Sequence, residues 1–135
     1  MSVVTNIEVA DSKTAENHFL TQLSLETDCW DVHHAIANER QDFILLDVRG
    51  EKDFQRGHLP KAIHLPHARL NEKTLASFPH SSCFVVYCAG PHCNGADKAA
   101  LRLAKLKRPV KKMLGGITGW LDEGFDLISE VAIEM

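Results

Sequence analysis

The segment FVVYCAGPHCNGADKAALRLA, residues 84–104, begins with four apolar residues that are β-branched or aromatic. Such a run is typical of a buried strand. The residues that follow include two glycines, a proline and an asparagine, which interrupt regular structure. From Ala96 onward, apolar residues recur at helical spacing and most charged residues lie between them. The segment therefore predicts a strand over 84–87 and a helix over 96–106, joined by a loop that begins at Cys88.

Cys88 is the candidate nucleophile, because it stands where the strand meets the loop. Free N–H groups in a curled loop and at a helix N-terminus attract anions and lower the pKa of a thiol among them. We therefore expect Cys88 to be a thiolate in an anion-binding loop formed by Ala89, Gly90, Pro91, His92, Cys93, Asn94 and Gly95. The alternative is that Cys88 is a buried apolar cysteine that closes the strand.

Composition limits the class of protein. A chain of 135 residues that is 44% hydrophobic suits one domain. A net charge of -3 argues against a nucleic-acid partner. The first residues lack a signal peptide, and no apolar run approaches the roughly 20 residues that span a bilayer, so we expect a cytoplasmic protein without a membrane partner. The cysteines are then expected to be free thiols, and their spacing predicts neither a metal site nor a cofactor: they are Cys29, Cys83, Cys88 and Cys93.

The N-terminal part predicts two helices. Apolar positions follow a helical period from Ser12 to Leu25, with Asp11 or Ser12 as N-cap. A second helix is expected after Thr27 as N-cap, with Cys29 on its buried face. We therefore divide the chain into an N-terminal helical extension, residues 1–26, and a main domain, residues 27–135. The extension could either cover an edge of the sheet or form a dimer contact, so the sequence allows both a monomer and a homodimer.

A second apolar run, FILL at residues 43–46, predicts another buried strand, which ends at Asp47. Because functional groups gather at the carboxyl ends of parallel strands, Asp47, Arg49 and Cys88 are expected on one edge of the sheet. Asp47 either caps the following turn or supports the site. Arg49 is either its ion-pair partner or a ligand for a donor's negative charge.

The remaining pattern alternates strands with helices. We expect strands at 62–65 and 110–114, and helices at 51–56, 70–78 and 117–123. Such alternation predicts an α/β fold with a mainly parallel sheet and helices on both faces.

Four motifs in this order resemble those of single-domain rhodaneses, the sulfurtransferase fold: LLDVR, FQRGHLPKAIHLP, VVYC with its loop, and GGITGWLDEGFDL, together covering about residues 43–127. The resemblance implies a three-layer sandwich with about five strands, plus the extra N-terminal helix. It further implies that Cys88 takes sulfane sulfur from a small donor such as thiosulfate, holds it as a persulfide in the loop of residues 89–95, and passes it to a thiol or another nucleophile on a small molecule or a protein.

The loop departs from the family pattern. It contains neither arginine nor lysine, so thiosulfate is expected to be a poor donor, and His92 offers a charge only when protonated. The loop is also one or two residues longer than usual, and it lacks the arginine that closes the loop of the related phosphatases. Cys93 is either a resolving thiol for Cys88 or a packed apolar group. Three functions remain: a sulfurtransferase, a catalytically silent binding or regulatory module, and a thiol redox enzyme that uses Cys88 and Cys93.

Overall fold

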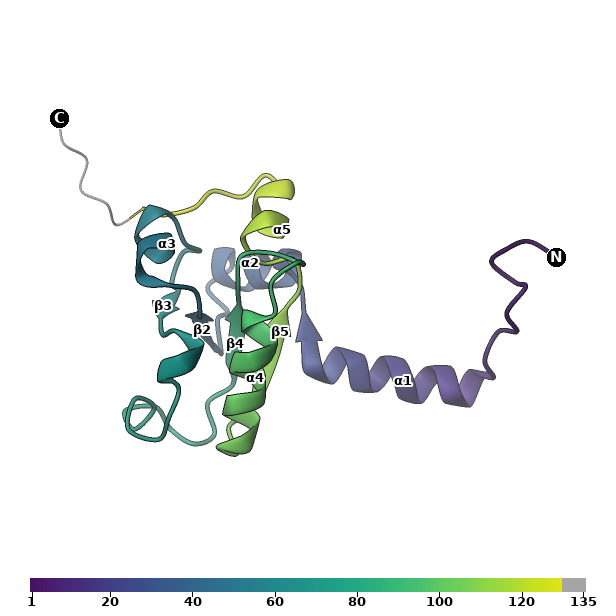
Figure 1. The fold of residues 1–135 in the computed structure, drawn as a ribbon, viewed down its shortest axis with the longest axis horizontal. Coiled ribbons are helices and arrows are strands. Elements are labelled where there is room, and N and C mark those ends of the chain that lie inside the picture. Colours follow the sequence, from purple (N-terminus) through teal and green to yellow (C-terminus); the bar gives the residue numbers. More distant parts are fainter. Residues whose placement is uncertain (130–135) are drawn as a thin grey trace.

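The computed structural model describes residues 1–129, which form a five-stranded sheet with helices around it (Figure 1). The strands lie in the order β1-β5-β4-β2-β3 and every neighbouring pair is parallel. They are β1 (Glu26–Thr27), β2 (Ile44–Asp47), β3 (Ile63–His64), β4 (Phe84–Tyr87) and β5 (Val110–Met113). The predicted parallel α/β sheet is confirmed. All four residues of β4 are buried. Because β4 is the central strand, Cys88, which follows it, lies at the middle of the carboxyl edge of the sheet.

Helices cover both faces of this sheet. The helices are α1 (Ser12–Leu25), α2 (Cys29–Ala37), α3 (Glu51–Arg56), α4 (Gly95–Lys105) and α5 (Gly116–Asp122). One core cluster joins Val86 of β4 to Leu103 of α4. The second cluster joins Val85 of β4 to Val32 of α2 and Trp120 of α5. Since alternate residues of β4 pack into opposite clusters, the three-layer arrangement is confirmed.

The prediction of a helix at residues 70–78 is wrong. A short 3₁₀ helix, η1 (His67–Arg69), is followed by turns instead. The Asn71 Oδ1 accepts from the Thr74 N–H at 2.9 Å, and the Thr74 Oγ1 accepts from the Asn71 N–H at 3.1 Å. Such local bonds compete with helix formation. The buried guanidinium of Arg108 also donates to carbonyls in this segment, those of Leu75, Phe78 and Pro79.

The start of the main domain also differs from expectation. Asp28, rather than Thr27, caps α2, because its side chain accepts from the Asp31 N–H at 2.8 Å. Thr27 belongs to β1, which pairs with the end of β5. The boundary expected after residue 26 thus falls inside this strand.

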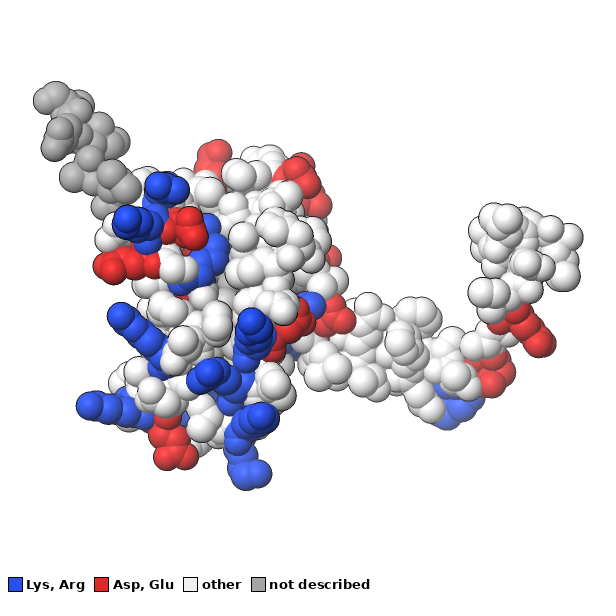
Figure 2. All heavy atoms as spheres, in the orientation of Figure 1, with Lys and Arg blue, Asp and Glu red and all other residues white. Residues whose placement is uncertain are grey.

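Helix α1 has its predicted bounds and its predicted Asp11 cap, and it extends away from the sheet (Figure 1). It buries no side chain, and Phe19, Leu20 and Leu23 are each more than half exposed. Figure 2 shows a mostly uncharged surface along it. Within residues 1–129, no helix has the length and apolar character needed to cross a membrane.

Candidate functional site

Cys88 is held in place by the start of α5. Its carbonyl accepts from the Ile117 N–H at 3.1 Å, and the Ala89 carbonyl accepts from the Thr118 N–H at 3.0 Å. These bonds require Gly116 to approach the loop closely, and it lies against the Cys88 carbonyl with φ +56°. A Cβ on Gly116 would meet this carbonyl and would also lie 2.9 Å from the Gly90 nitrogen. Only glycine fits this position without strain. The first turn of α5 therefore fixes the direction in which the loop leaves β4.

The loop brings two sulfur atoms together at the N-terminus of α4. The Cys93 N–H donates to the Gly90 carbonyl at 3.0 Å, which turns the chain back, and the Gly95 N–H donates to the Cys93 Sγ at 3.5 Å. A Cβ on Gly95 would lie 2.8 Å from the Cys88 Sγ and 3.5 Å from the Cys93 Sγ. The Cys88 Sγ thus occupies space that a side chain at residue 95 would need, and the Cys93 Sγ lies at contact distance beside it.

Main-chain N–H groups surround these sulfur atoms. The Gly95 N–H donates to the Cys93 Sγ, and the N–H groups of Ala89 and Gly95 act against burial by lowering the pKa of both thiols. Within the described part of the chain, the N–H groups of Gly90, His92 and Asn94 donate to no protein atom. The side chains of Pro91 and His92 are exposed. The loop of residues 89–95 therefore has the free donors that an anion or a persulfide requires.

The two thiols have opposite pKa shifts. Burial, together with the hydrogen bond to Cys93, raises the pKa of Cys88 to about 11. The hydrogen bond from the Cys88 thiol and that from the Gly95 N–H lower the pKa of Cys93. Cys93 is therefore the thiol that ionises more readily, while burial opposes the expected Cys88 thiolate in the free protein.

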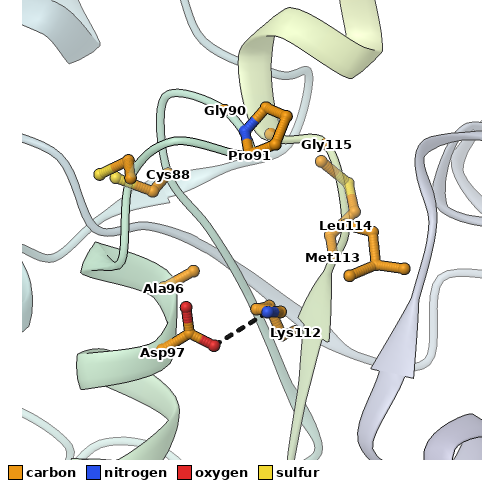
Figure 3. A pocket seen from close by; sticks show the side chains of 11 residues that line it. Cys88, Gly90, Pro91, Ala96, Asp97, Lys112, Met113, Leu114 and Gly115 are labelled. Atoms are coloured by element: carbon orange, nitrogen blue, oxygen red, sulfur yellow. Dashed lines mark hydrogen bonds and ion pairs between the residues drawn. The ribbon is translucent and has the colours of Figure 1, made fainter.

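Two cavities flank the loop, and both reach Cys88 and Cys93. The first, of about 220 Å³, lies between the loop, the start of α4 and the end of β5 (Figure 3). It contains an ion pair in which the Lys112 Nζ lies 2.9 Å from the Asp97 Oδ1. The second, of about 280 Å³, lies toward the end of β2 and is also lined by His67, whose buried Nδ1 has no hydrogen-bond partner among the described residues.

Asp47 and Arg49 form a buried hydrogen-bond cluster beside the second cavity. The Asp47 carboxylate accepts from the Arg49 N–H at 3.0 Å, from the Arg49 Nη2 at 2.7 Å and from the Tyr87 hydroxyl at 2.7 Å. The Arg49 Nη2 also donates to the Gly57 carbonyl at 2.6 Å. Burial and the Asp47 charge raise the pKa of Tyr87. These contacts fit the turn-capping and ion-pair roles, since the Arg49 guanidinium is already engaged.

None of the four cysteines is in a disulfide, and no group of three or more histidine, cysteine, aspartate or glutamate side chains within residues 1–129 is placed to hold a metal ion. Cys29 is in the core, where its Sγ lies 3.4 Å from the Leu114 carbonyl.

Sequence reasoning missed the side chains of the first cavity. Lys111 and Lys112 are consecutive in a strand and therefore point to opposite faces of the sheet. This alternation indicates that one of them lies beneath α4, but it does not reveal that Asp97 meets it. The only sign in the sequence of the contact between Gly116 and the Cys88 carbonyl is the pair of consecutive glycines, Gly115 and Gly116.

Comparisons with known proteins concern the family and the fold. The model of the rhodanese-like domain family matches residues 31–123. An HTH-type transcriptional regulator from Mycobacterium tuberculosis is 34% identical over 92 residues, which cover 64% of this chain and 40% of the regulator. The chain thus spans less than half the length of this curated relative.

Solved structures extend the likeness. A Bacillus halodurans protein has a TM-score of 0.86 and 34% identity, with 90% of this chain and 88% of that chain covered. A thiosulfate sulfurtransferase from Pseudomonas aeruginosa has a TM-score of 0.64 and 21% identity, with 89% of this chain and 23% of that chain covered. The second likeness shows the fold alone.

Proposed function

Because the chain belongs to the rhodanese-like family, we propose that it is a sulfurtransferase that carries sulfane sulfur as a persulfide on Cys88. The observation that carries this proposal is the placement of the Cys88 Sγ under two cavities and among the N–H groups of Ala89 and Gly95. A persulfide adds one sulfur atom beyond Sγ, and its negative charge lies where the free N–H groups of the loop can stabilise it.

In the first half-reaction, the Cys88 sulfur attacks the sulfane sulfur of the donor. The new S–S bond forms on Cys88, the bond between the sulfane sulfur and the rest of the donor breaks, and the leaving group takes its electron pair. The Cys88 proton passes to the Cys93 thiolate, to which it is already hydrogen-bonded. Cys93 thus serves as the general base that a buried thiol with a raised pKa requires.

In the second half-reaction, an acceptor thiolate attacks the outer sulfur of the persulfide. The bond between the two persulfide sulfur atoms breaks, the Cys88 sulfur keeps the electron pair, and the acceptor leaves as a persulfide. A covalent intermediate of this kind divides the transfer into two displacements at one sulfur and needs no cofactor.

Intact-mass measurement tests the proposal. After incubation with a panel of sulfane-sulfur donors, the protein should gain about 32 Da, one sulfur atom, and a reductant should remove it. Cys88→Ser should not gain this mass, whereas Cys83→Ser, which changes a half-buried thiol outside the loop, should gain it like the wild type. Equal loading of Cys88→Ser and wild type would contradict the proposal.

The contact between the two sulfur atoms favours a second candidate, a thiol redox enzyme. Attack of the Cys93 thiolate on a Cys88 persulfide would form a Cys88–Cys93 disulfide and release hydrosulfide; an organic disulfide as oxidant would give the same product with release of two thiols. Disulfide mapping after exposure to an oxidised dithiol distinguishes the candidates. A reversible Cys88–Cys93 disulfide that forms during turnover supports the redox enzyme, and sulfur transfer that proceeds without any such disulfide excludes it.

A further inference from the structure

The first cavity has two charged side chains, those of Lys112 and Asp97, and they neutralise each other. Asp97 lies in the first turn of α4 and Lys112 on β5, so two separate elements fix the pair. The Lys112 side chain is 28% exposed and that of Asp97 is 56% exposed, and the ion pair therefore lies at the cavity wall with one side open to solvent. In Figure 3 it stands across the cavity from the loop that holds Cys88.

The rest of the cavity wall is apolar or main chain. Pro91 closes it at the loop, Ala96 at the start of α4, and Met113 and Leu114 along the end of β5. The cavity thus offers three features in sequence: the two sulfur atoms, an apolar wall, and a fixed pair of opposite charges.

This arrangement selects among classes of small thiol. An anion alone would approach Lys112 only beside the Asp97 carboxylate, which repels it. An apolar molecule would desolvate the ion pair without replacing its contacts with water. A ligand that carries an ammonium and a carboxylate on one carbon satisfies both charges at once, with the ammonium toward Asp97 and the carboxylate toward Lys112.

The volume sets the size of the group that the cavity can enclose. A cavity of about 220 Å³ holds roughly seven water volumes of about 30 Å³ each. A free amino acid with a short thiol side chain has a similar number of non-hydrogen atoms, whereas a tripeptide thiol is far larger.

Building on the function proposed above, we propose that the sulfur acceptor is a free α-amino acid thiol, the class of cysteine and homocysteine, and that Lys112 and Asp97 determine this specificity. The amino acid end binds the ion pair, and its thiolate attacks the outer sulfur of the Cys88 persulfide. The new S–S bond forms on the amino acid, the persulfide S–S bond breaks, and the electron pair returns to Cys88.

Acceptors that differ in one group at a time test the inference on persulfide-loaded protein. L-Cysteine and L-homocysteine carry both charges, cysteamine only the ammonium, 3-mercaptopropionate only the carboxylate, 2-mercaptoethanol neither, and glutathione carries both on a larger molecule. After correction for thiol pKa, kcat/KM for L-cysteine should exceed that for each of the last four at least tenfold. Equal rates within about twofold across the series would overturn the inference.

Two variants separate the charges. Lys112→Gln should raise KM for L-cysteine about tenfold and leave kcat nearly unchanged. Asp97→Asn should also weaken L-cysteine use, but it frees Lys112 and should therefore improve the use of 3-mercaptopropionate. Lys111→Gln is the matched control, because Lys111 lines a different cavity on the opposite face of β5 and should leave every acceptor unaffected. An unchanged KM in Lys112→Gln would overturn the inference.

A binding measurement separates this inference from the proposed transferase reaction. S-Methyl-L-cysteine cannot accept sulfur, and calorimetry should show that it binds the wild type and Lys111→Gln but binds Lys112→Gln at least tenfold more weakly. Persulfide loading without such binding or acceptor preference would refute the amino acid site alone. Binding that depends on Lys112, without any persulfide on Cys88, would support the amino acid site and refute the transferase.

Discussion

Replacing Cys93 with alanine is expected to lower the pKa of Cys88. Three effects raise this pKa: burial first, then the hydrogen bond to Cys93, and then the charge of Cys93. The variant removes the last two and leaves burial in place. The N–H groups of Ala89 and Gly95, which act in the opposite direction, also remain.

The size of the effect follows from the shift itself. The pKa of Cys88 is raised from 9.0 to about 11, and burial is the largest cause. Removal of Cys93 should therefore reverse part of the shift, and the thiolate fraction of Cys88 below pH 10 should rise about tenfold for each pH unit by which its pKa falls. Because nucleophilicity falls as the pKa of a thiol falls, with a Brønsted coefficient of about 0.5, the alkylation rate should rise only about threefold for each such unit.

The assay is alkylation by iodoacetamide at a series of pH values, with each cysteine-containing peptide quantified by mass spectrometry. The midpoint of the Cys88 rate profile should move to lower pH in Cys93→Ala. The control is Cys83→Ala, since Cys83 lies before β4, away from the loop, and should leave the profile unchanged. An unchanged or higher midpoint in Cys93→Ala would show that Cys93 does not hold the charge, and the assignment of Cys93 as the base would fail.

Further expectations concern reactivity and stability. In the wild type, Cys93 should be alkylated before Cys88 at neutral pH, because its pKa is lowered. Gly116→Ala should lower the free energy of unfolding in urea by at least about 2 kcal/mol, since alanine is strained at positive φ and its Cβ would also meet the Cys88 carbonyl oxygen. Gly50→Ala should leave it unchanged, because nothing lies within 4 Å of the added Cβ. Asp47→Asn should lower the free energy of unfolding by about 3 kcal/mol, because it breaks a buried ion pair. Persulfide loading per folded molecule should stay unchanged, and reduced loading would assign Asp47 to the site. Deletion of residues 1–25 should change the unfolding free energy by less than about 1 kcal/mol, because α1 buries no side chain. A larger loss would indicate that α1 packs in an assembly. A melting temperature that depends on protein concentration only in the full chain would indicate the same.

The sequence predicts the fold well where each strand is long enough to show its apolar character. β2 and β4 are continuous apolar runs, and they form the centre of the sheet in register, with Ile44 opposite Phe84. The same patterns place Cys88 at the carboxyl edge. β1 escapes detection because a strand of two residues shows no periodicity, and its pairing with β5 depends on contacts distant in the chain.

The helix expected at 70–78 and the charge state of Cys88 show where local patterns are insufficient. Helical spacing in that segment is real, but Asn71 and Thr74 bind each other's main-chain N–H groups. The Arg108 guanidinium, some thirty residues later, holds the end of the segment in turns through the carbonyls of residues 75, 78 and 79. Likewise, the sequence places Cys88 beside helix N–H groups that lower a pKa, but it does not show that burial raises the pKa of Cys88 or that the pKa of Cys93 is the one lowered. Both outcomes depend on tertiary packing.

The net charge that suits the sulfur donor follows from three features of the site taken together. The loop has no arginine or lysine, hydrogen bonds lower the pKa of Cys93, and the Lys112 charge is neutralised by Asp97. A dianion such as thiosulfate would meet the Asp97 carboxylate and the readily ionised Cys93 with only main-chain N–H groups to compensate them. A zwitterion meets neither penalty, because its ammonium offsets its carboxylate. The persulfide of an amino acid thiol therefore suits the donor position for the same reason that the free thiol suits the acceptor position, and transfer in both directions between Cys88 and one class of molecule is the simplest chemistry for this pocket.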